Sequence, residues 1–181
     1  MDFSQDHFAL FGLPRRYALD EATLGRLYHE IQARVHPDKH VHLSDAERRL
    51  AMQWTTRINE AYQVLRQPLS RAKYLLGLAG VDVDQEREMS GEFLMRQMEL
   101  RETVAAARAA GDVARLEDLD GKLKRELAQE YAKLATALEA VPEAEQASSS
   151  QAAGAVKLLR QLMFQEKLLH EIDDALAAAE A

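Results

Sequence analysis

The sequence predicts an all-α protein. Its 181 residues include only 8 glycines and 4 prolines, and sheet-rich folds need more turn residues than that. Apolar residues make up 47% of the chain, and in long stretches they recur every three or four positions, a spacing typical of amphipathic helices. The composition therefore predicts a folded helical chain rather than a disordered one.

Composition also excludes several classes of protein. The absence of cysteine excludes disulfides, thiol catalysis and cysteine-based metal sites, and it suits a reducing compartment. The net charge of −7 argues against a nucleic-acid partner, because phosphate contacts need a basic face. The longest uncharged apolar run, 74–81, is too short to cross a membrane, and Asp2 stands where a signal peptide would be basic. We therefore expect a cytoplasmic protein with no membrane partner.

Charge divides the chain into two parts. Residues 1–76 carry a net charge of +2 and residues 77–181 a net charge of −9. Between them, a segment with Gly77 and Gly80 has no helical period. We therefore predict an N-terminal domain over 1–76, a linker over 77–87 and a C-terminal domain over 88–181.

Two helices are predicted in the first domain. Asp20 is a good N-cap for the first, whose apolar residues lie on one stripe: Leu24, Leu27, Tyr28, Ile31 and Val35. This helix ends before Pro37, because the residue that precedes a proline is pushed out of the α region.

Ser44 and Glu47 form a capping box for the second helix. Its stripe is Leu50, Trp54, Ile58, Ala61 and Leu65, and Pro68 ends it before a short helix over 69–76. The two long helices should pack as an antiparallel hairpin. The hairpin tip then displays His36, Pro37 and Asp38, while Arg26, His29 and Arg34 lie on the solvent face of the first helix.

In the first helix of the second domain, three large apolar residues lie off the stripe that is predicted to be buried. At about 100° per residue, its predicted buried stripe is Phe93, Gln97, Leu100, Val104 and Ala107. Leu94, Met95 and Met98 lie off that stripe, with Glu99 and Glu102 beside them. Exposed apolar residues that adjoin one another mark a partner surface; the alternative is that they only widen the core face.

Two further stripes complete an antiparallel three-helix bundle. The first consists of Leu116, Leu119, Leu123, Leu127, Tyr131, Leu134 and Leu138. After a predicted loop over 143–155, the second consists of Leu159, Leu162, Leu169, Ile172 and Leu176. Phe164 and Leu168 lie off this stripe, and Phe164 is a second candidate exposed anchor, because aromatic residues are frequent at binding hot spots. Exposed apolar residues could also support weak self-association.

Several motifs in this frame carry a resemblance to a known family. The His-Pro-Asp turn, with Asn59-Glu60-Ala61-Tyr62 and Arg71 and Tyr74 after it, resembles the J-domain of DnaJ-type co-chaperones. The segments 6–14, 68–76 and 93–102 narrow the match to the HscB family, the J-type co-chaperones of bacterial iron–sulfur cluster assembly. The resemblance covers nearly the whole chain.

This resemblance implies a non-enzymatic co-chaperone without a cofactor, which stimulates the ATPase of an HscA-type chaperone of the DnaK family. The implied chaperone-binding residues are His36, Pro37, Asp38, Arg26, His29, Arg34 and Lys39. The implied binding site for the cluster scaffold protein, of the IscU type, consists of Leu94, Met95, Met98, Glu99, Glu102 and Phe164. The chain departs from the family pattern at Glu30, within a run that is often basic, and at 105–107, where alanines replace an expected basic residue.

Other interpretations of the same residues remain open. The His-Pro-Asp turn could serve only to end the helix, and the basic residues could simply form a face exposed to solvent. In that case the protein would only tether two partners to each other. His36, His40 and His42 with Asp38 could bind a metal ion, although they do not have the spacing of a zinc-binding helix. An acid–base pair of His36 and Asp38 would lack a nucleophile nearby in sequence.

Overall fold

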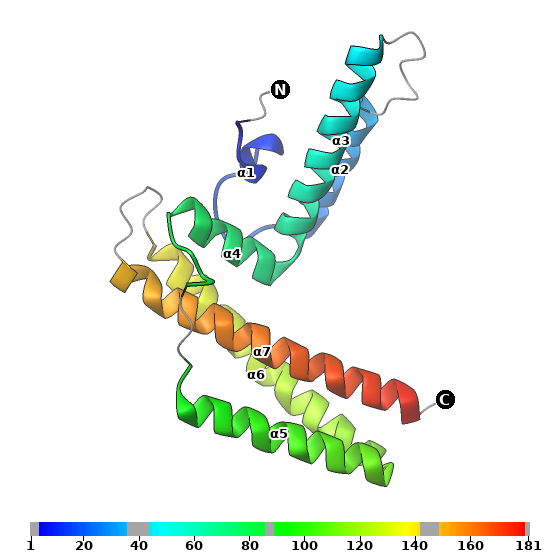
Figure 1. Ribbon diagram of the computed structural model, residues 1–181, viewed down its shortest axis with the longest axis vertical. Helices are drawn as coiled ribbons and strands as arrows, with labels where there is room; N and C mark the ends of the chain where they lie inside the picture. Colours follow the sequence, from blue (N-terminus) through cyan, green and yellow to red (C-terminus); the bar gives the residue numbers. More distant parts are fainter. Residues whose placement is uncertain (1–3, 36–43, 86–88, 142–148, 180–181) are drawn as a thin grey trace. The chain divides into compact units, whose positions relative to one another are not determined.

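The computed structural model describes residues 4–35, 44–85, 89–141 and 149–179. Within these ranges the chain is helical and contains no strand (Figure 1), which confirms the predicted all-α class. It divides into two compact units, Met1–Leu75 and Leu76–Ala181, which are described separately below.

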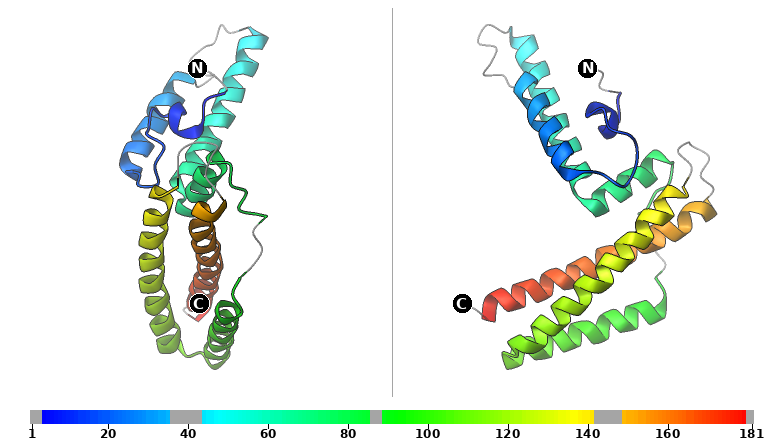
Figure 2. Two further views of the ribbon diagram at one scale, coloured as in Figure 1. Left: turned by 90° about the vertical axis from the view of Figure 1, so that its left-hand side faces the viewer. Right: turned by 180° about the vertical axis from the view of Figure 1, so that it is seen from behind.

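The first unit is built on a helical hairpin. Helices α2 (Glu21–Val35) and α3 (Asp45–Arg66) run side by side in opposite directions (Figures 1 and 2). The short helix α1 (His7–Leu10) packs against α3, and α4 (Pro68–Leu78) begins directly after the hairpin and runs into the second unit. The buried residues of this unit are mostly aromatic or aliphatic: Phe8, Phe11, Tyr17, Leu24, Trp54, Ile58, Ala61, Leu65 and Ala72.

The predicted helix starts of the hairpin are confirmed. The carboxylate of Asp20 accepts hydrogen bonds from the backbone N–H groups of Ala22 and Thr23, at 3.3 and 3.1 Å. Ser44 and Glu47 form the expected capping box. These bonds satisfy N–H groups that have no partner in the first turn of a helix, and the sequence therefore sets where both helices begin.

The second unit is a three-helix bundle of α5 (Gly91–Ala110), α6 (Val113–Glu139) and α7 (Ser149–Ala179). Contacts between Phe93 and Phe164 and between Arg101 and Glu171 show that α5 and α7 run in the same direction. Helix α6, which lies between these two helices in the sequence, runs in the opposite direction (Figure 2). Gly111 ends α5 with φ of +64°, a left-handed conformation that glycine adopts at little cost.

Three expectations about burial and boundaries are wrong. Leu50 is 47% exposed rather than part of the α3 core. Leu168, expected off the α7 stripe, is 1% exposed, because α7 is packed by both other helices and buries a wide face. The loop expected over 143–155 ends earlier, since α7 already begins at Ser149; the small side chains of Ala152 and Ala155 are buried.

Candidate functional site

The candidate chaperone-binding site consists of three residues of α2 and of the segment 36–39, which follows this helix in the sequence. Its central residues His36, Pro37, Asp38 and Lys39 lie outside the described residues, as do His40 and His42 of the metal hypothesis. The structure therefore fixes only the two helix ends that flank this segment, at Val35 and Ser44.

The basic candidates on α2 are solvent-exposed. Arg26, His29 and Arg34 all lie on the outer side of the helix, as predicted. Arg26 is already paired, because its Nη1 lies 2.6 Å from Oε1 of Glu30 one turn later. Glu30 thus neutralises part of the basic face, and Arg34 is the arginine nearest in sequence to His36, Pro37 and Asp38.

A half-buried polar cluster joins α2 to α3. The Tyr28 hydroxyl donates to Oδ1 of Asn59 at 3.0 Å, and Nε2 of Gln32 donates to the same oxygen at 3.1 Å. The Tyr28 ring also stacks on Tyr62, with 4.1 Å between centroids. Because hydrogen bonds and ring stacking depend on geometry, these contacts set the register of the two helices that flank residues 36–43.

The N-terminal segment is attached to α4 by one histidine. The backbone N–H of His7 donates to the Tyr74 hydroxyl at 3.0 Å, and the two rings stack at 4.2 Å. Burial lowers the pKa of His7 below its ordinary value, and the nearby Arg57 guanidinium lowers it further. His7 is therefore favoured in its neutral form.

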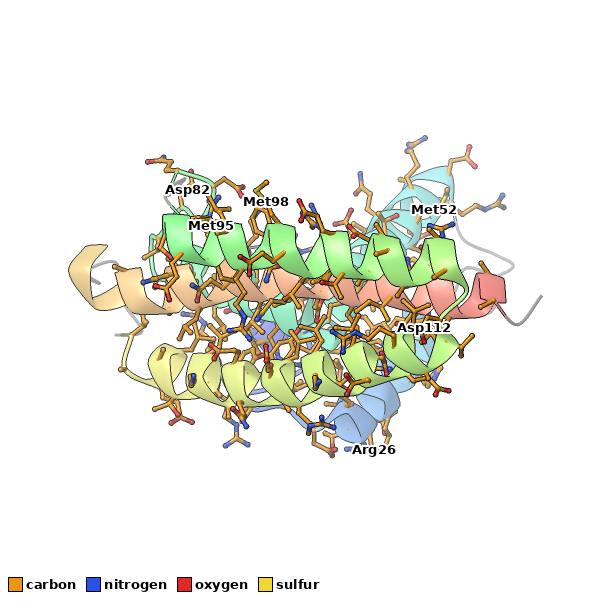
Figure 3. The ribbon with its side chains drawn as sticks, turned by 90° about the horizontal axis from the view of Figure 1, so that it is seen from below. Arg26, Met52, Asp82, Met95, Met98 and Asp112 are labelled. Carbon is orange, nitrogen blue, oxygen red and sulfur yellow. The ribbon has the colours of Figure 1, made fainter. Side chains whose placement is uncertain are left out.

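The candidate scaffold-binding site lies on α5. Leu94, Met95 and Met98 are 40, 64 and 62% exposed, which confirms that these large residues face water. Figure 3 shows Met95 and Met98 on the side of α5 that points away from α6. We call these three residues the α5 patch. The opposite face of the helix buries Gln97, Val104 and Ala107 and partly buries Phe93 and Leu100, so the α5 patch lies outside the packed face.

Acidic residues flank the α5 patch. Glu99 and Glu102 are exposed, and neither carboxylate forms an ion pair within the part of the chain that the structure describes. Beyond them, Ala105, Ala106 and Ala107 continue α5, while Arg101 is 3.4 Å from a carboxylate oxygen of Glu171 on α7. The rim of the patch on α5 is therefore acidic.

Phe164 lies next to the α5 patch but is only half exposed. Its ring meets that of Phe93 edge-on, at 6.3 Å between centroids and an interplanar angle of 88°. Phe93 directly precedes Leu94, so this contact brings α7 up to the start of the patch. Sequence reasoning missed Met163, which is 37% exposed beside Phe164; the signal available was its position off the α7 stripe.

The described residues contain no group of three or more histidine, aspartate or glutamate side chains placed to hold a metal ion. None of the helices in the described ranges combines the length and apolar character needed to cross a bilayer. Among the features that these ranges offer to a partner is the α5 patch, an exposed apolar surface.

The chain is similar to known co-chaperones over its whole length. It is 50% identical to the co-chaperone protein HscB homologue of Azoarcus sp. (strain BH72) and 47% identical to that of Aromatoleum aromaticum, over 99% of this chain and 98% of each relative. A family described as the HSCB C-terminal oligomerisation domain matches residues 89–173.

Solved structures agree with these sequence relatives. The chaperone HscB of Vibrio cholerae aligns with a TM-score of 0.80 and 34% identity, over 94% of this chain and 96% of that one. The human co-chaperone HscB aligns with a TM-score of 0.82 and 26% identity, over 96% of this chain and 83% of that one. The length of these alignments and the identity of the relatives lead to one conclusion: this chain belongs to the HscB family of co-chaperone proteins.

Proposed function

We propose that the protein is a cytoplasmic J-domain co-chaperone that assists the maturation of iron–sulfur proteins. It stimulates the ATPase of an HscA-type chaperone of the DnaK family and delivers an IscU-type scaffold protein to it. In this proposal residues 1–76 form the J-domain, 77–87 the linker and 88–181 the scaffold-binding bundle. The observation that carries the proposal is the exposed α5 patch, in a chain whose relatives are named co-chaperones along its full length.

In the scaffold-binding arm, the α5 patch provides the apolar centre of the interface. Burying its three side chains against a partner removes apolar surface from water, and methionine adapts well to irregular contacts. Glu99 and Glu102 at its edge favour basic groups on the scaffold, since complementary charge sets the orientation of a complex. Phe164 extends the apolar surface onto α7.

In the chaperone-binding arm, His36, Pro37 and Asp38 act as the trigger, with Lys39, Arg34, Arg26 and His29 providing positive charge. The pair of Arg26 and Glu30 lowers the charge available for long-range attraction, so Arg34 and Lys39 should contribute most of the steering. The sequence has no glycine-rich phosphate-binding loop. In this proposal ATP is therefore bound and hydrolysed by the partner, and this chain is not an enzyme.

The chaperone-binding arm is tested by the steady-state ATPase rate of the HscA-type chaperone. Wild-type protein should raise the rate, and scaffold protein should raise it further. His36→Gln should abolish the stimulation while scaffold binding persists. Equal rates with wild-type and His36→Gln protein would instead make the chain a tether with an inert hairpin tip.

The scaffold-binding arm is tested by substituting the α5 patch. Met98→Ala should weaken scaffold binding by about 2 kcal/mol or more, the cost of removing an interface anchor, while the melting temperature barely changes. Met52 offers a matched control, because it is a methionine of nearly the same exposure, 63%, on α3 of the other unit. Equal scaffold affinity of Met98→Ala and Met52→Ala in titration calorimetry would overturn this assignment.

Weak self-association is a second candidate use of the α5 patch. Its support is the description of the matching family as an oligomerisation domain, together with the exposed apolar residues. Sedimentation of wild-type protein should then show a concentration-dependent dimer that Met98→Ala removes. A dimer that survives this substitution would place self-association on another surface.

A further inference from the structure

A small pocket in the second unit lies beside the α5 patch, and of its lining residues only Phe164 has a role in the function proposed above. Its volume is about 120 Å³, and it lies between residues 83–84 and one side of α7. The lining residues are Val83, Asp84, Arg160, Met163, Phe164 and Lys167. Pockets that take small molecules usually exceed about 300 Å³, so this one suits a single side chain.

One hydrogen bond holds the two walls of this pocket together. Nη1 of Arg160 on α7 donates to the carbonyl oxygen of Val83 at 3.2 Å. Val83 is itself 3% exposed, so the segment before α5 is anchored on α7. The pocket is thus part of the folded unit.

The lining of the pocket combines apolar surface with a cation. Met163 and Phe164 supply apolar surface that water can still reach. Lys167 is exposed, and its ammonium forms no ion pair with any of the described residues. Asp84 also lines the pocket, which leaves two cationic side chains against one anionic side chain.

The pocket adjoins the α5 patch through Phe164. That side chain forms one wall of the pocket and packs edge-on against Phe93, the neighbour of Leu94. Figure 3 shows Asp82, which precedes Val83, on the same side of this unit as Met95 and Met98. A protein that covers the patch therefore has the pocket within the same interface.

We propose that this pocket is a second anchor point for the scaffold protein and that it takes one acidic side chain of that protein. The carboxylate pairs with the Lys167 ammonium, and the aliphatic part of the side chain lies against Met163 and Phe164. The inference rests on the proposed scaffold-binding function. Glu99 and Glu102 on α5 then face basic groups of the scaffold, and Lys167 on α7 faces an acidic group, so charge complementarity helps to set how the scaffold lies across the two helices.

The test is scaffold binding by full-length protein carrying Lys167→Glu, measured by titration calorimetry at two salt concentrations. The affinity should fall about tenfold or more, since like charges across an interface are unfavourable, and its salt dependence should decrease. Lys167→Arg should retain the affinity. Lys133→Glu is the matched control: it makes the same charge change on α6, at a lysine that is paired with Glu130.

The acidic partner is then identified on the scaffold. Exposed aspartates and glutamates of the scaffold are replaced by lysine one at a time, and the affinity of each scaffold variant for the Lys167→Glu protein is measured. One of these replacements should restore the affinity. If Lys167→Glu binds as well as Lys133→Glu while Met98→Ala is impaired, the pocket assignment is wrong and the proposed function stands. If wild-type protein does not bind the scaffold, both proposals fall.

Discussion

Helices α5 and α6 belong to the same bundle but differ in the size of the side chains that they bury and expose. Helix α6 buries six leucines, at Leu116, Leu119, Leu123, Leu127, Leu134 and Leu138. Helix α5 fully buries only Gln97, Val104 and Ala107, and it exposes the large apolar residues Leu94, Met95 and Met98. Packing alone explains the choice of residues in α6, whereas in α5 the large apolar residues are unfavourable in contact with water unless a partner covers them.

The two faces of α5 therefore serve different purposes. Its inner face packs against α6 and α7. Its outer face has the side chains that a binding site needs, with carboxylates around them. This difference is the strongest physical argument for a partner on α5, and two stability tests of different size address it.

The largest effect is expected from the core that α7 shares with the other helices. Leu168→Ala removes a side chain that is 1% exposed and should lower the free energy of unfolding by about 3 kcal/mol, within the range for buried leucines. The loss should appear in urea unfolding followed by circular dichroism. Leu94→Ala, at a residue that is 40% exposed, should cost far less. Similar losses for the two variants would contradict the assignment of core and surface.

Much of this division can be predicted from the sequence because it depends on local spacing. The leucine repeat of α6 and the exposure of Leu94, Met95 and Met98 both follow from helical periodicity. The helix starts at Asp20 and Ser44 also follow, because a capping side chain bonds within three residues of itself.

The missed features depend on contacts between distant residues. Helix α1 has only four residues and is held through His7 by Tyr74, 67 positions away. The pocket at Lys167 exists because Arg160 binds Val83, 77 positions away. The burial of Leu168 depends on how many neighbours α7 has, which its own periodicity does not encode. None of these has a signal in the local pattern.

A smaller effect, in the opposite direction, is expected on the inner face of α5. Gln97 is 3% exposed, and its Oε1 has no hydrogen-bond partner among the described residues. Because an unsatisfied buried polar atom is costly, Gln97→Leu should raise the free energy of unfolding by about 1 kcal/mol. Urea unfolding measures the gain, and Gln129→Leu, at an exposed position on α6, controls for the added apolar side chain. A loss of stability would mean that the amide has a partner in solution, such as a bound water.

The smallest effect is expected on the pH dependence of the stability of the first unit. The pKa of His7 lies below its ordinary value of about 6.5, first because of burial and then because of Arg57. Protonation therefore favours the unfolded chain, so the contribution of His7 to stability is complete above pH 6.5 and is lost as the pH falls below it. Trp54, the single tryptophan of the chain, is buried in the first unit and reports its unfolding by fluorescence. Urea midpoints from Trp54 should fall between pH 7.5 and 5.5, and His7→Phe, which keeps a ring against Tyr74 but cannot titrate, should reduce that fall. An equal pH dependence in the two proteins would show that other groups cause it, and that the contact between His7 and Tyr74 does not make the first unit acid-sensitive.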